Sequence, residues 1–217
     1  AIVGPDPAKY VTGVGFFTPG SPYASDEALA PLNGPRSIDR AKQALREAGY
    51  RGETIRLLGT TDIVSTTAQA QVAADLLRRL EVNADIVLTD WGTVAQRRMN
   101  RGPLDQGGWS CACFATSGMD FINPVTHLQL RSDGDAAAPG WPNLPEVERL
   151  RAEWLEAPDL ASQQAIARRI QAAAMEGLPY IPTGAYYSIT AHRRGLAARE
   201  GAGQDHRLAP RRQVDRP

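Results

Sequence analysis

The chain has 217 residues, 42% of them hydrophobic, so it is long enough to bury a core and to form one or two domains. Its 24 Lys and Arg residues balance its 24 Asp and Glu residues, so no net field favours nucleic acid or an anionic membrane surface as a partner. The sequence contains no apolar run of the roughly 18 residues that a bilayer-spanning helix needs. The start at Ala1, without a charged and then apolar leader, indicates a mature chain or a fragment.

The first half of the chain alternates predicted strands and helices after an irregular, Pro/Gly/Ser-rich start. Ser37 is a favourable N-cap for a helix that runs to Ala48, and Gly49 is suited to a left-handed C-terminal position. The run "ETIRLL" at 53–58 predicts a short strand. A second helix follows, with a predicted inward apolar stripe of Val72, Ala73, Leu76, Leu77 and Leu80.

Two further strands are predicted at 82–90 and 109–115, separated by a short helix at 93–100. The resulting order is strand, helix, strand, helix, strand. Such alternation with short links predicts an α/β fold, in which a mostly parallel sheet is flanked by helices.

The second half is predicted to contain two long helices and a returning strand. Pro145 suits the first turn of a helix that buries Val147, Leu150 and Trp154. Asp159 can cap the next helix, with Leu160, Ile166, Ile170 and Ala173 inward and Gly177 as its stop. The Pro-punctuated run at 178–191 suits an edge strand, and the Arg-rich chain from His192 onward is expected to be mostly unstructured.

The two cysteines, Cys111 and Cys113, are best interpreted as small buried hydrophobic residues on one face of a strand. A reactive thiol needs an electropositive neighbour or a helix N-terminus, and the nearby sequence supplies neither. A zinc site would need two further ligands, and the only histidines are His127, His192 and His206. The sequence also lacks a nucleophile elbow and a phosphate loop, so no catalytic residue, metal or cofactor is predicted.

A polar turn after the third predicted strand is the strongest site candidate, because ligands of open α/β sheets bind at the carboxyl ends of the strands. Thr116, Ser117, Asp120 and Asn123 offer donors and acceptors there. The alternative is that Asp120 and Asn123 only hydrogen-bond their own turn. Asp90, after the second strand of this series, is interpreted mainly as a helix cap.

Trp141, in a Gly/Pro loop, is the other candidate. It can form part of a ligand wall or cover an edge of the core, and the sequence favours neither.

Several segments, taken in order, resemble the C-terminal lobe of the extracytoplasmic solute-binding proteins of ABC importers, in the dipeptide/oligopeptide/nickel family (solute-binding protein family 5). They are "AKQALREAGYRGETIRLL", "QVAADLLRRLEVNADI", "DWGTVAQRR" and the stretch 145–187, which ends in "PYIPTGAYY". The resemblance runs from about Tyr23 to about His192. It implies a periplasmic-binding-protein-like lobe at 23–192, a leading segment at 1–22, a tail at 193–217, and a missing N-terminal lobe of the same protein.

The resemblance also implies a function. It is the non-enzymatic capture of a peptide or another small solute outside the cytoplasm, for delivery to ABC permease subunits. No nucleic-acid partner is expected. In peptide-binding members, an aspartate three residues after a tryptophan pairs with the α-amino group of the peptide. Those positions are Thr116 and Met119 here, with Asp120 next, so either Asp120 serves an offset version of this contact or the solute lacks an amino terminus.

The ligand-binding residues predicted for this lobe are Thr116, Ser117, Met119, Asp120, Asn123 and Trp141. Two alternatives stay open at this stage. One is a thiol-dependent enzyme that uses Cys111 or Cys113 with His127, and the other is a stand-alone sensory ligand-binding domain.

Overall fold

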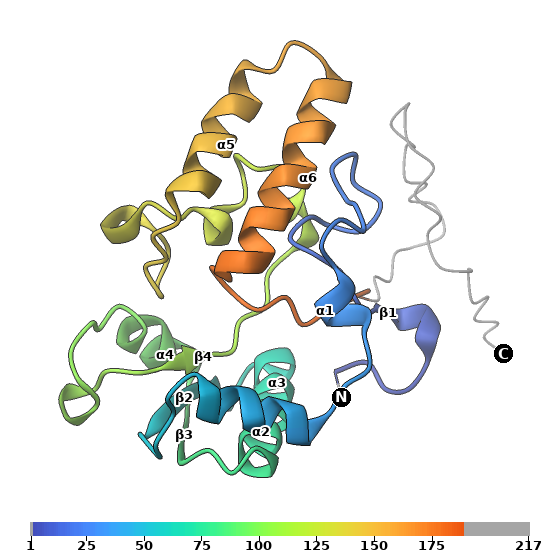
Figure 1. Ribbon diagram of the computed structural model, residues 1–217. Coiled ribbons are helices and arrows are strands. Elements are labelled where there is room, and N and C mark those ends of the chain that lie inside the picture. The colour runs from blue at the N-terminus through green and yellow to red at the C-terminus, as the bar shows by residue number, and fades with distance from the viewer. Residues whose placement is uncertain (1, 189–217) are drawn as a thin grey trace, which may run out of the picture.

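Three parallel strands form the larger of two sheets in the protein, whose computed structural model describes residues 2–188 (Figure 1). They are β2 (Ile55–Thr60), β3 (Ala84–Thr89) and β4 (Cys111–Ala112), in the order β3-β2-β4. The predicted parallel sheet is therefore confirmed. The third strand is shorter than predicted, because β4 pairs with β2 only at Cys111 and Ala112. Leu57 and Leu58 of the central strand are both buried, as expected when both faces of a sheet are covered.

The helices on the sheet begin and end close to the predicted positions. Helix α2 (Ile38–Glu47) is capped by Ser37, whose hydroxyl accepts the Arg40 N–H at 3.3 Å, and Gly49 is left-handed with φ 88°. Helix α3 (Val64–Arg79) follows β2, and α4 (Trp91–Arg97) follows β3. In residues 2–188, no helix is both long and apolar enough to cross a membrane.

The predicted inward stripe of α3 is wrong at two positions, since Val72 is 56% exposed and Leu76 is 45% exposed. The buried residues of the helix are Thr66 and Ala70 instead. The reason is a close approach to β2: a Cβ added at Gly59 would lie 2.4 Å from the Cβ of Ala70. This contact between small residues sets which face of α3 meets the sheet.

Helices α5 (Pro145–Glu156) and α6 (Leu160–Gly177) form a helical pair that carries most of the buried hydrophobic cluster (Figure 1). Val147, Leu150 and Trp154 are buried as predicted. The carboxylate of Asp159 caps α6 by accepting the Ser162 N–H at 2.7 Å. Two details differ from the prediction. Leu160 is 52% exposed, and the left-handed residue at the end of α6 is Leu178 (φ 47°) rather than Gly177.

The start of the chain packs onto this helical pair. Phe16 and Phe17 are buried in the cluster, although the predicted lobe begins only at Tyr23. Strand β1 (Tyr10–Val11) pairs antiparallel with β5 (Ala185–Tyr186), which lies in the predicted returning segment. Short helical turns complete the described chain: α1 (Ala30–Asn33), η1 (Pro7–Lys9), η2 (Leu104–Gln106), η3 (Gly118–Phe121), η4 (Leu128–Leu130) and η5 (Gly134–Ala136). The predicted tail at 193–217 lies outside the described residues.

Candidate functional site

The loops that follow β2, β3 and β4 meet at the carboxyl edge of the parallel sheet, where α/β folds bind ligands. The first two loops are held together by Asp62, whose two carboxylate oxygens accept the backbone N–H of Trp91 at 3.0 and 3.1 Å. The backbone N–H of Thr61 also donates to the carbonyl of Thr89 at 2.8 Å. The edge is therefore preorganised by bonds between loops that are far apart in the sequence.

Asp90 caps α4, as predicted. Its Oδ1 accepts the Thr93 backbone N–H at 2.9 Å, and its Oδ2 accepts the Thr93 hydroxyl at 2.6 Å. These hydrogen bonds with the side chain and backbone of Thr93 lower the pKa of Asp90. The carboxylate is therefore committed to the helix that positions Trp91.

The third loop contains the predicted polar turn, and its side chains bond mainly to groups of the turn itself and of the residues just after it. The Thr116 hydroxyl donates to Oδ2 of Asp120, and Ser117 accepts the backbone N–H of Met119 at 3.2 Å. Oδ1 of Asn123 accepts the N–H groups of Val125 and Thr126 at 2.9 and 3.1 Å. The structure thus brings five of the six predicted residues into one turn, with the Met119 side chain exposed. Their contact with a solute stays a prediction.

The turn is also tied to the beginning of the chain. The backbone N–H of Thr18 donates to the carbonyl of Phe121 at 3.1 Å, and the Thr18 hydroxyl donates to the carbonyl of Gly118 at 2.5 Å. These bonds fix the turn against the segment that carries Phe16 and Phe17.

Trp141, the sixth predicted residue, has other neighbours. Its ring centroid lies 6.1 Å from that of Trp109, and the guanidinium carbon of Arg101 lies 4.4 Å from the Trp141 ring centroid. Arg101 in turn pairs with Asp135. Trp141 is therefore part of an aromatic and cationic cluster, and its role as a ligand wall stays a prediction.

Arg98 is a residue of this edge that the sequence reasoning missed. Its guanidinium carbon lies 5.3 Å from the ring centroid of Trp91 and 5.6 Å from that of Phe114. Trp91 begins α4 shortly after β3 and Phe114 follows β4, so the cation is held between the start of this helix and the segment after β4. The seven-residue spacing of Trp91 and Arg98, two turns along one helix face, was the available signal.

The thiols and His127 do not form a nucleophile and base pair. Burial raises the pKa of Cys111, and burial, followed by the charge of Cys111, raises that of Cys113 to about 11. A nucleophilic cysteine needs the opposite shift. His127 is fully buried and its Nε2 lies 3.1 Å from the Tyr180 hydroxyl, so its polar partner is a phenol. The thiol-enzyme alternative is not favoured.

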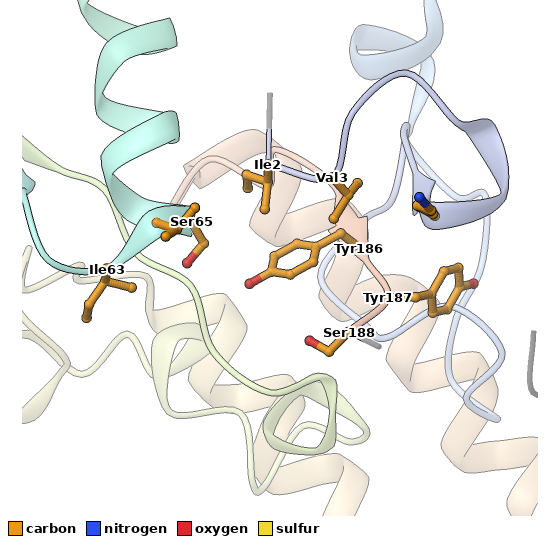
Figure 2. A pocket seen from close by; sticks show the side chains of 9 residues that line it. Ile2, Val3, Ile63, Ser65, Tyr186, Tyr187 and Ser188 are labelled. Carbon is orange, nitrogen blue, oxygen red and sulfur yellow. The ribbon is translucent and has the colours of Figure 1, made fainter. Parts of the chain in front are cut away.

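A cavity of about 570 Å³ opens between the start of α3 and strand β5 (Figure 2). Ile63, Val64 and Ser65 line one side, and Tyr186, Tyr187 and Ser188 line the other, with Ile2, Val3 and Lys9 completing it. No pattern in the sequence indicates this cavity, because residues from three distant segments line it. In residues 2–188, no cluster of His, Cys, Asp and Glu side chains is suited to hold a metal ion.

Comparison with known proteins identifies relatives in sequence. The chain matches no protein-family model. A protein of Sinorhizobium fredii, the probable peptide ABC transporter periplasmic-binding protein y4tO, is 38% identical over 146 residues, which are 67% of this chain and 28% of that protein. The resemblance predicted from the sequence is confirmed by this relative.

Solved structures share the fold. The ABC transporter substrate-binding protein CtaP of Listeria monocytogenes superposes with a TM-score of 0.71 at 17% identity, covering 85% of this chain and 36% of that one. DppA of Helicobacter pylori, in complex with the peptide STSA, gives a TM-score of 0.66 at 19% identity, covering 83% and 34%. A dipeptide-binding protein of a Pseudoalteromonas species, in complex with Met-Leu, gives 0.62 at 20% identity, covering 82% and 35%. The predicted fold class is thereby confirmed, and the chain spans about a third of the length of these proteins.

Proposed function

We propose that this chain forms one lobe of a clamp for a peptide or another small solute. The chain belongs to the family of extracytoplasmic solute-binding proteins of ABC transporters. The clamp would deliver its solute to the permease subunits of an importer. Binding rather than catalysis, and a location outside the cytoplasm, are proposed from the same relationship, since the Sinorhizobium fredii relative is named as a periplasmic-binding protein.

The observation that carries this proposal is the carboxyl edge of the sheet β3-β2-β4. Three loops meet there and present Asp62, Trp91 and the turn 116–123, all positioned by hydrogen bonds within the lobe. Rigid loops at this edge suit a surface against which a second lobe closes. Closure around a solute creates the differential affinity that a transporter can sense.

The domain boundaries follow from this proposal. Residues 23–192 would form the lobe, with 1–22 leading into it and 193–217 as a tail, and positions 189–217 lie outside the described residues. Phe16 and Phe17 pack in the core of the lobe, so the leading segment contributes to its stability.

The test measures solute binding by two proteins. One is this chain, and the other is the chain joined to the N-terminal lobe of the Sinorhizobium fredii relative. Thermal unfolding is followed with dipeptides, oligopeptides, sugars and nickel. We expect one solute class to stabilise the joined protein and to act weakly or not at all on this chain, because half of the contacts are then absent.

Asp120→Ala in the joined protein tests the turn, with exposed Asp75→Ala on α3 as the matched control. Loss of the solute-induced stabilisation in the first variant alone supports a binding role for the turn. Equal stabilisation of this chain and the joined protein would contradict the half-clamp proposal.

A further inference from the structure

The cavity of Figure 2 is lined by none of the residues of the polar turn 116–123. Its volume of about 570 Å³ lies within the range of about 300–1,000 Å³ that is usual for small-molecule pockets. Most of the lining side chains are apolar or aromatic, namely Ile2, Val3, Ile63, Val64, Tyr186 and Tyr187. A cavity with this size and lining suits an apolar group of a ligand.

One wall of the cavity is the start of α3, which hydrogen bonds hold against β2. Thr66 is buried, and its hydroxyl donates to the carbonyl of Ile63 at 3.2 Å. The Thr67 hydroxyl lies 2.7 and 2.9 Å from the carbonyl oxygens of Thr60 and Ile63. Val64 is nevertheless 75% exposed. This wall therefore presents apolar surface on a backbone that is already fixed.

The opposite wall is β5, which is held by a separate set of bonds. Tyr186 pairs with Tyr10 of β1, and the backbone N–H of Tyr187 donates to the carbonyl of Lys9 at 2.9 Å. Figure 2 shows the Tyr186 ring pointing from β5 toward Ser65 at the start of α3. A group bound between the two walls would contact both of them, and little ordering of the backbone would be needed.

The charge and the position of the cavity indicate what it binds. Lys9 is the one charged residue that lines it in the described part of the chain, and the Lys9 ammonium lies 3.8 Å from the Asp6 carboxylate. A neutral group is therefore favoured. Ile63 directly follows Asp62, whose carboxylate fixes the Trp91 backbone at the carboxyl edge of the sheet. The cavity thus adjoins the edge at which the solute is proposed to bind.

We infer that this cavity binds an apolar side chain of the solute, aliphatic or aromatic, between the start of α3 and strand β5. The inference rests on the proposed function and specifies the solute as a peptide with at least one apolar residue. Val64 and Tyr186 contact that side chain from the two walls. Burial of apolar surface supplies the affinity, so peptides of small or polar residues bind less tightly.

The experiment compares N-acetyl-leucinamide with N-acetylglycinamide, two neutral probes that differ only in their side chain. Binding to this chain is followed by NMR, with the ring signals of Tyr186 and the methyl signals of Val64 as reporters. We expect the leucine probe to shift these signals and to bind about tenfold to a hundredfold more tightly than the glycine probe.

Val64→Asp should abolish the shifts of the Tyr186 signals, because it places a charge on the cavity wall. A carboxylate in the first turn of a helix is favourable, so this variant is expected to fold. Val72→Asp, at another exposed valine of α3, is the matched control and should keep the shifts. Equal binding of the two probes, or shifts that persist in Val64→Asp, would overturn the inference.

The chain joined to the relative's N-terminal lobe separates this inference from the proposed function. Solutes that stabilise the joined protein regardless of their apolar side chains would leave the clamp intact and contradict the inference. Coverage of Val64 and Tyr186 by the added lobe without solute would make the cavity a contact between lobes, which also contradicts it. Failure of every solute to stabilise the joined protein, with leucine-probe binding retained, would contradict the clamp while supporting an apolar site in this lobe.

Discussion

The carboxylate of Asp62 accepts the backbone N–H of Trp91 with both oxygens, at 3.0 and 3.1 Å, and so joins the loops after β2 and β3. We expect Asp62→Ala to lower the free energy of unfolding by about 1 kcal/mol, because a charged acceptor is lost at a loop junction. Urea denaturation measures this, with Asp75→Ala as the control, since its exposed pair with Arg78 contributes little. Equal losses in the two variants would show that Asp62 does not join the loops.

Gly59 sets the distance between the central strand and α3. An added Cβ would lie 2.4 Å from the Ala70 Cβ and 2.8 Å from Leu88 Cδ2. Gly59→Ala should therefore destabilise the protein by about 1–3 kcal/mol through overpacking. Combining it with Ala70→Gly should cost less than the sum of the two single changes, which a double-mutant cycle measures. Strict additivity would mean that the two positions do not touch.

This contact explains why the sequence predicts some elements better than others. Helices α2 and α6 follow from local signals, namely the Ser37 and Asp159 caps and apolar positions at helical spacing. The face that α3 buries depends instead on a strand glycine eleven positions before Ala70, so Val72 and Leu76 were wrongly expected to point inward. Periodicity identifies a helix, but packing between distant residues decides how it is rotated.

The candidate site likewise has one part that the sequence predicts and other parts that it does not. The turn 116–123 is continuous in sequence and was predicted as a unit. The Arg98 contacts join segments after β3 and β4, and the cavity of Figure 2 joins three segments, so neither follows from spacing along one stretch. Trp141 lies between these cases, because its loop was evident but its partner Trp109 was not.

Gln171 of α6 connects the start of the chain to the helical pair. It is 1% exposed, and its Nε2 donates to the Ser25 carbonyl, the Ser25 hydroxyl and the Glu27 carbonyl at 2.9, 3.0 and 2.7 Å. Gln171→Ala should cost about 1–3 kcal/mol, because it removes three hydrogen bonds to partly buried acceptors and leaves a cavity where a buried side chain stood. Faster proteolysis near Ser25 should accompany the loss. Exposed Gln43→Ala is the control and should change stability by less than about 0.5 kcal/mol.

The two thiols should react slowly while the protein is folded. Burial raises the pKa of Cys111, and the pKa of Cys113 rises from 9.0 to about 11, so the thiolate fraction of Cys113 at pH 8 falls about a hundredfold. Iodoacetamide labelling followed by mass spectrometry should show little modification at pH 8 until urea is added. Rapid labelling of the native protein, inhibited by a His127→Gln change, would instead revive the thiol-enzyme alternative.

The buried imidazole of His127 makes stability depend on pH. Burial, and then the charge of Arg151, lower its pKa from 6.5 to about 3, so the folded state holds the neutral ring where the unfolded state binds a proton. The contribution of the neutral His127 ring to the free energy of unfolding is complete above pH 6.5. It is lost as the pH falls toward 3, at about 1.4 kcal/mol per pH unit. Between pH 7 and pH 5 the wild type should therefore lose about 2 kcal/mol more than His127→Gln, which keeps a partner for the Tyr180 hydroxyl. Urea denaturation at pH 7 and pH 5 measures the difference, because the acidic groups that both proteins share contribute equally to the two losses. Equal losses in the wild type and in His127→Gln would show that another group takes up the proton.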